Sequence, residues 1–92
     1  MKKIIAVCGM GIGTSVLLKM NAEKVLRKLG ATADIRAADI EAAKAEASNA
    51  DILLTSAELA DQFADVPSEV VVIDNFTNLS EIEAKLGPLV EG

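Results

Sequence analysis

The sequence predicts an α/β fold in which a four-stranded parallel sheet lies between two layers of helices. Four short runs of apolar, largely β-branched residues alternate with four segments of helical periodicity, and the connections between them are short. This alternation produces right-handed crossovers and a parallel sheet covered on both faces. Ninety-two residues with an apolar fraction of 51% suffice for one core. We therefore expect a single domain over residues 1–92, a three-layer, flavodoxin/Rossmann-like sandwich with strand order 2-1-3-4.

The first half of the chain begins with a buried strand over residues 2–7, which is followed by a long helix over residues 14–29. Five positions at the helical period define the face of this helix that packs on the sheet: Leu18, Ala22, Val25, Leu26 and Leu29. Gly30 is expected to end the helix as its C′ residue. Val16 and Met20 point nearly opposite the packing face, so we expect them to form an exposed patch that faces a partner.

Three further strands are predicted over residues 32–37, 51–55 and 69–73, where β-branched or alternating apolar residues are bounded by turn-forming ones. Asp39 is a good N-cap for a short, alanine-rich helix that ends near Ala47.

Two sequence motifs predict the remaining helix starts. Ser56 or Thr55 is expected to cap a short helix over residues 57–63, where Thr55-x-x-Glu58 matches a capping box, and Ser80-x-x-Glu83 matches another for the last helix. We expect the last helix to end near Leu86, because Gly87-Pro88 follows.

Composition excludes several classes of function. The net charge of −5 and the lack of Trp and Tyr argue against nucleic acid as a partner. The absence of histidine removes histidine bases and nearly all zinc designs, and we expect no cofactor. Cys8 is the only cysteine, and the N-terminal apolar run of four residues is too short for a signal peptide or a membrane span. These features predict a cytoplasmic protein.

Charge is unevenly divided along the chain. Residues 1–36 carry a net charge of +5, and residues 37–92 carry −10. The basic part suits a site that handles phosphate, although ordinary surface charge gives the same pattern.

A glycine-rich stretch, Cys8-Gly9-Met10-Gly11-Ile12-Gly13-Thr14-Ser15, joins the first strand to the first helix. Glycines at three alternate positions allow positive φ, so that backbone N–H groups converge on an anion at the positive end of the helix dipole. A helix N-terminus also lowers the pKa of a neighbouring thiol. We interpret Cys8 as a nucleophile whose thiolate accepts a phosphoryl group. The N–H groups of seven residues would hold that group, and the hydroxyls of the last two would add donors or cap the helix: Gly9, Met10, Gly11, Ile12, Gly13, Thr14 and Ser15.

Other interpretations of this loop fit less well. The lysine of a Walker A loop is absent, and the glycine spacing is not that of a dinucleotide fingerprint. A low-molecular-weight cysteine phosphatase has C-x5-R-S, where this chain has Thr14 in place of the arginine that drives hydrolysis. A cysteine of this kind can also be an inert, buried apolar residue, and Thr55 and Ser56 fit helix caps better than ligands.

The Cys-Gly-x-Gly-x-Gly-Thr-Ser motif after the first strand resembles the phosphocysteine loop of enzyme IIB of the bacterial sugar phosphotransferase system (PTS). Within that system the chain is most similar to the galactitol and ascorbate branch, and especially to the ascorbate type. Further matching segments extend the resemblance over nearly the whole chain: Lys19-Met20-Asn21, Glu23-Lys24-Val25-Leu26, Ala38-Asp39-Ile40, Asp51 to Ser56 and Ile73-Asp74-Asn75-Phe76. One departure is Thr14. Many ascorbate-type proteins have serine at this position, and in having threonine there this chain resembles the galactitol type.

The resemblance implies a phosphoryl relay. A phosphohistidine of enzyme IIA would pass its phosphoryl group to Cys8, and Cys8 would pass it to a sugar, L-ascorbate or a related one, held by the membrane transporter, enzyme IIC. The protein would then act at the inner face of the membrane, and no metal is required. A phosphatase-like cysteine hydrolase and a non-catalytic anion-binding module remain the alternatives.

Overall fold

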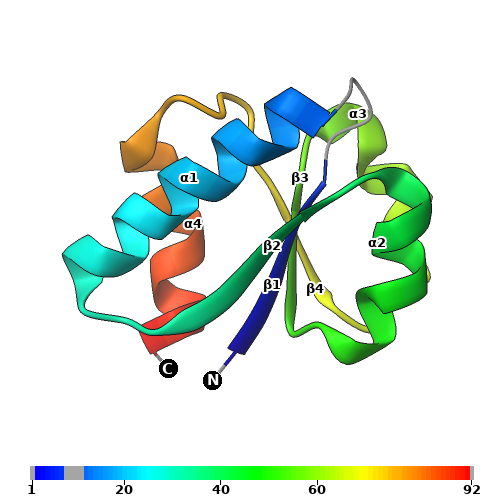
Figure 1. Cartoon of the computed structure of the whole chain (residues 1–92), viewed down its shortest axis with the longest axis horizontal. Coiled ribbons are helices and arrows are strands. Elements are labelled where there is room, and N and C mark those ends of the chain that lie inside the picture. Colours follow the sequence, from blue (N-terminus) through cyan, green and yellow to red (C-terminus); the bar gives the residue numbers. More distant parts are fainter. Residues whose placement is uncertain (1, 8–11, 92) are drawn as a thin grey trace.

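The computed structural model describes residues 2–7 and 12–91, with the backbone alone for residues 12–15 and 91. Its centre is a sheet of four parallel strands in the order β2-β1-β3-β4, as the sequence predicts (Figure 1). The strands are β1 (Lys2–Val7), β2 (Ala33–Ala38), β3 (Ile52–Thr55) and β4 (Glu69–Val72). β2 begins and ends one residue later than predicted, β3 begins one residue later, and β4 ends one residue earlier.

Helices cover both faces of the sheet (Figure 1). α1 (Ile12–Leu29) and α4 (Leu79–Glu91) lie side by side on one face. α2 (Ile40–Glu46) and α3 (Ala57–Ala60) cover the other face, and each continues into a 3₁₀ turn, η1 (Ala47–Asn49) and η2 (Asp61–Phe63). The predicted three-layer arrangement is therefore confirmed.

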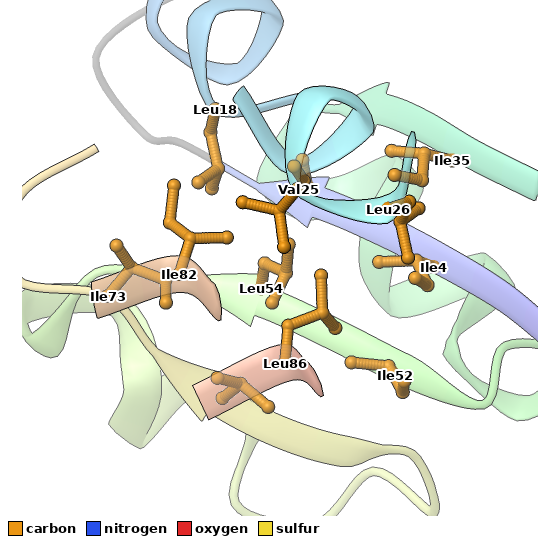
Figure 2. Packing of buried hydrophobic residues seen from close by; sticks show 13 residues of the cluster. Ile4, Leu18, Val25, Leu26, Ile35, Ile52, Leu54, Ile73, Ile82 and Leu86 are labelled. Atoms are coloured by element: carbon orange, nitrogen blue, oxygen red, sulfur yellow. The ribbon is translucent and has the colours of Figure 1, made fainter. Parts of the chain in front are cut away.

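The main apolar core lies between the sheet and the α1–α4 layer. Figure 2 shows Val25 of α1 and Leu86 of α4 meeting over Leu54 of β3. Four of the five predicted contact positions of α1 are buried in this core: Leu18, Ala22, Val25 and Leu26. Leu29 is half-buried and packs against its edge.

A smaller core lies on the opposite face, since successive strand residues point to opposite sides of a sheet. Ile5, Val7 and Leu53 contact Ala43 and Ala47 there, together with Phe63, the largest fully buried side chain. Alanines allow the short second layer to pack closely on the strands.

The start of α1 differs from the prediction. The helix begins at Ile12, two residues before the predicted Thr14, so Gly13 lies in its first turn rather than in a loop of positive φ. Glycine can adopt helical φ and ψ at a modest entropic cost. The N-cap of α2 is as predicted, because the Asp39 Oδ1 accepts a hydrogen bond of 2.8 Å from the Ala42 N–H.

Both predicted capping boxes are wrong. Of the two predicted caps of α3, Ser56 and not Thr55 occupies the N-cap, and its side chain makes no capping hydrogen bond. At α4 the cap is Asn78, whose Oδ1 accepts from the Glu81 N–H at 3.2 Å, so the helix begins before Ser80.

The end of α4 also differs, because the helix does not stop at Leu86 but runs through Gly87-Pro88 to Glu91. Pro88 lacks an N–H group, which leaves the Ala84 carbonyl without its helical partner. Ala84 and Pro88 are both exposed, so water can form a hydrogen bond with the Ala84 carbonyl. Leu89 and Val90 pack against the main core, and their burial favours the continued helix.

Gly30 ends α1 as predicted. Its φ is +70°, its N–H donates to the Arg27 carbonyl at 3.2 Å, and the Ala31 N–H donates to the Leu26 carbonyl at 2.9 Å. This is a Schellman motif, in which a left-handed residue satisfies the last helical carbonyls.

We expect Gly30→Ala to lower the free energy of unfolding by about 1 kcal/mol, because an L side chain is strained at this φ. A Cβ atom there would meet nothing within 4 Å, so the loss is conformational and not a clash. Gly30→Asn should lose less, since asparagine tolerates the left-handed region. Urea unfolding of the three proteins measures this, and equal stability of the alanine variant would contradict it.

Candidate functional site

The predicted site lies at the carboxyl edge of the two central strands. β1 ends at Val7 and β3 at Thr55, and the pairing of Ala6 with Leu54 places these two end residues side by side. α1 begins at the same edge (Figure 1). This is the switch point of the sheet, where the connections from β1 and β3 lead to opposite faces and where ligands of α/β folds bind.

Four of the predicted site residues, Cys8, Gly9, Met10 and Gly11, lie outside the described residues. Four others, Ile12–Ser15, form the first turn of α1, where the backbone N–H groups have no partner within the helix. The structure thus places the N-terminus of α1 five residues after the end of β1.

The first turn of α1 differs in charge from those of the other three α-helices. α2, α3 and α4 each carry a carboxylate in the first turn, contributed by Glu41, Glu58 and Glu81. The first turn of α1 contains no acidic residue. A carboxylate there would compete with a bound anion for the positive end of the dipole, so its absence suits an anion site.

Thr55 closes β3 at this edge and is fully buried, with 0% of its surface exposed. Its Oγ1 has no hydrogen-bond partner within the described part of the chain. A buried hydroxyl without a partner costs about 1–3 kcal/mol, so partnerless hydroxyls are rare in folded proteins. The predicted cap role is wrong for Thr55.

Three apolar side chains are exposed on the second and third turns of α1. Val16, Leu17 and Met20 are 39%, 40% and 51% exposed, which confirms the predicted exposure of the first and third. They form a patch, called here the α1 patch, beside the carboxyl edge of the sheet. Single exposed apolar residues are common, but three neighbours on adjoining turns form a surface that another protein can cover.

Asn21 connects α1 to the loop between β4 and α4. Its side chain is nearly buried, and its Nδ2 donates a hydrogen bond of 2.6 Å to the Phe76 carbonyl. This bond fixes the position of the loop against the helix that carries the α1 patch.

The same loop is held from its other side by Glu81. The carboxylate accepts from the Asp74 N–H at 2.7 Å and the Asn75 N–H at 2.9 Å, and it pairs with the Lys85 Nζ at 2.7 Å. Lys85 also donates to the Val72 carbonyl at 2.7 Å. The bond from Lys85 and the two backbone N–H groups lower the pKa of Glu81 from 4.5 to about 2, and the paired carboxylate raises the pKa of Lys85.

Sequence reasoning missed the roles of Asn21, Glu81 and Lys85. The spacing of Glu81 and Lys85 is that of an i, i+4 ion pair, a signal that could have identified them. The bonds of Asn21 to Phe76 and of Glu81 to the loop backbone join segments whose proximity no local pattern reveals. Among the described residues, no group of three His, Cys, Asp or Glu side chains is placed to hold a metal ion.

We expect the stabilising effect of Glu81 to depend on pH. Because its pKa is lower in the folded chain than the ordinary 4.5, its contribution is complete above about pH 4.5 and is lost as the pH falls toward 2. The difference in the free energy of unfolding between the wild type and Glu81→Gln should therefore shrink over this range. Urea unfolding at several pH values measures it, and a difference independent of pH would contradict the assignment.

Comparison with known proteins identifies the family. Residues 3–87 match the family model described as "PTS system, Lactose/Cellobiose specific IIB subunit". The chain is also 34% identical over 88 residues to a protein of Mycoplasma pneumoniae (strain ATCC 29342 / M129 / Subtype 1) named "Ascorbate-specific PTS system EIIB component", with 95% of this chain and 93% of that protein covered. No helix in the described residues is long and apolar enough to cross a membrane. The predicted resemblance is confirmed: this chain belongs to the IIB family of the sugar phosphotransferase system, whose members act as phosphotransferases in sugar uptake.

Proposed function

We propose that Cys8 is the phosphoryl acceptor of this IIB protein. It takes the group from a phosphohistidine of enzyme IIA and passes it to a sugar held by the membrane enzyme IIC, at the inner face of the membrane. L-Ascorbate or a related sugar is the proposed substrate, since the Mycoplasma relative is named for ascorbate. Because the description of the family model names lactose and cellobiose, these two disaccharides are the substrates with which ascorbate should be compared.

The relay consists of two displacements at phosphorus. In the first, the Cys8 thiolate attacks, an S–P bond forms, and the N–P bond to the IIA imidazole breaks with its electron pair left on nitrogen. In the second, a sugar hydroxyl oxygen attacks, an O–P bond forms, and Cys8 leaves as a thiolate while the hydroxyl proton passes to solvent. Such transfers need in-line positioning and stabilisation of charge on the phosphoryl oxygens.

One observation carries this proposal. The only cysteine of the chain directly follows the buried end of β1, at the edge where α1 presents the only α-helical first turn without a carboxylate among the described residues. Backbone N–H groups at a helix start stabilise a thiolate and also bind phosphoryl oxygens. Gly9, Met10 and Gly11, with the first turn of α1 at Ile12, Gly13, Thr14 and Ser15, are the proposed phosphate-binding residues.

The absence of histidine supports the direction of the relay. Because this chain has none, the phosphohistidine must come from another protein. The α1 patch, formed by Val16, Leu17 and Met20, lies on the helix whose first turn would hold the phosphoryl group. We propose that IIA docks on the α1 patch, because a donor histidine can reach Cys8 only if the two proteins are in contact near that residue.

Transfer to Cys8 is tested by incubating the protein with phosphoenolpyruvate, the general phosphotransferase proteins and the cognate IIA, followed by intact-mass analysis. We expect one phosphoryl group on the wild type and none on Cys8→Ser, because the serine hydroxyl is not ionised at neutral pH. Addition of membranes with IIC should then transfer the group to ascorbate and not to lactose or cellobiose.

Two results would contradict the proposal. A phosphoryl group on the Cys8→Ser variant would place the acceptor elsewhere in the chain. Steady release of product from a chromogenic phosphate ester by the wild type would favour the phosphatase-like alternative.

The docking role of the α1 patch is tested with Met20→Asp. A charge in the centre of an apolar contact should lower the second-order rate constant of transfer from phospho-IIA by about tenfold or more. Ala45→Asp is the matched control, because it adds the same charge at an exposed position of α2 on the opposite layer. Equal rates for the two variants would exclude the patch from the contact.

A further inference from the structure

We propose that β2 is a surface through which two copies of this chain associate. In this association β2 pairs in the antiparallel direction with β2 of the second copy, about a two-fold axis at Ile35, and the two sheets continue into one another. The inference goes beyond the phosphoryl relay, because none of the residues on which it rests belongs to the proposed phosphate-binding segment.

β2 is an edge strand with an open outer side. It is the first strand in the order β2-β1-β3-β4, so its inner side pairs with β1. Figure 1 shows its ribbon passing in front of β1, with no described helix in front of it. The six residues Ala33–Ala38 give the strand a length of about 20 Å. The N–H and C=O groups on the outer side of such a strand are a template for a further strand.

The helix layers leave a hollow beside β2 on each face of the sheet. The cavity on the face covered by α1 has a volume of about 170 Å³ and is lined by Glu23, Leu26, Arg27, Ala31, Thr32 and Ala33. The cavity on the face covered by α2 also has a volume of about 170 Å³, and its lining includes Asp34, Arg36, Glu46 and Asn49. β2 is thus bordered by open space on both faces as well as along its outer side.

Two opposite charges lie on the same face of β2. Ile35 is buried in the main core, on the face covered by α1, so Asp34 and Arg36 lie on the face covered by α2. The Arg36 Nε is 3.6 Å from the Asp34 Oδ2, and the two side chains are 66% and 39% exposed. An exposed ion pair of this kind contributes little to the stability of a chain. Both charges are therefore available to a second copy.

Symmetry restricts the register in which two copies of β2 can pair. Residues opposite one another in an antiparallel pair point to the same face, so the two-fold axis passes at a residue and not between two residues. An axis at Asp34 places Asp34 opposite itself, and an axis at Arg36 places Arg36 opposite itself. Like charges directly opposite each other are destabilising. An axis at Ile35 instead places Asp34 of each copy opposite Arg36 of the other, which gives two ion pairs between the strands.

The other edge strand lacks this complementarity. Glu69 is the only charged residue of β4, so no register brings opposite charges together between two copies of that strand. β4 also has four residues where β2 has six. The charge pattern and the length of the strand therefore favour β2 as the edge that pairs.

The test is sedimentation equilibrium of the full chain over concentrations on both sides of the expected dissociation constant. A reducing agent is included, so that the single cysteine forms no disulfide between copies. One pair of strands is a small interface, and we expect a dissociation constant of about 10–100 μM. The mass should rise with concentration from 9.6 kDa toward twice that value.

Two charge reversals test the register. Asp34→Arg and Arg36→Asp each place like charges opposite one another twice, and each should weaken association by about tenfold or more. In an equimolar mixture of the two variants, one copy contributes two arginines and the other two aspartates, so both ion pairs form again. The mixture should associate with nearly the affinity of the wild type.

Asp61→Arg is the matched control for Asp34→Arg. It makes the same change of charge at an exposed position of η2, which follows the α3 helix that contacts β4. Association should be unchanged in this variant. Urea midpoints close to that of the wild type will show that the variants are folded.

Three results would overturn the inference. The first is a wild-type mass that stays at 9.6 kDa at every concentration. The second is association that neither charge reversal weakens, which would place the contact elsewhere, for example on the α1 patch. The third is a mixture of the two variants that does not associate although the wild type does. Each result leaves phosphoryl transfer to Cys8 to its own test, because no variant changes residues 8–15.

Discussion

The parallel pairing of β1 with β3 in one register is the constraint on which the rest of the molecule depends. Because Ala6 is opposite Leu54, Val7 and Thr55 end their strands together, and the connections to α1 and α3 leave from one edge toward opposite faces. A slip of one residue would turn the side chains of β3 to the wrong faces of the sheet and disrupt both apolar cores. Burial of Leu54 on one face and Leu53 on the other holds this register, so the packing of the core also positions the carboxyl ends of the two central strands.

The absence of a carboxylate distinguishes the first turn of α1 from those of the other three α-helices. Carboxylates occupy the first turns of α2, α3 and α4, and that of Glu81 is bound by two backbone N–H groups and Lys85. The start of α1 has no such carboxylate and is preceded by the chain that contains Cys8. In a protein with a net charge of −5, the positive end of this helix dipole suits the thiolate and the phosphoryl group that we propose it holds. An arginine clamp is absent from the motif, and a relay that transfers phosphate without hydrolysing it does not need one.

Much of this arrangement could be predicted from the sequence, because its signals are local. Apolar periodicity predicts the strands and the buried face of α1, and Gly30 and Asp39 are helix boundaries in the structure as the sequence predicts. The failures involve competition between local and tertiary effects. Ser80-x-x-Glu83 is a good capping box, but Asn78 caps the helix and Glu81 bonds the loop instead. Gly87-Pro88 should end a helix, but burial of Leu89 and Val90 continues it. Within the predicted site, the start of α1 at Ile12 moves Gly13 into the helix, and the roles assigned to Cys8–Gly11 stay predictions.

The central claim is that the sulfur of Cys8 is held as an anion at the start of α1. The most direct measurement is an NMR titration of the wild-type protein labelled with carbon-13 at the cysteine Cβ, which reports the ionisation of this single thiol. We expect a pKa well below the ordinary value of about 8.5, with the thiolate present at neutral pH. A pKa at or above that value would contradict it, because a protonated thiol buried like an ordinary apolar side chain cannot accept the phosphoryl group.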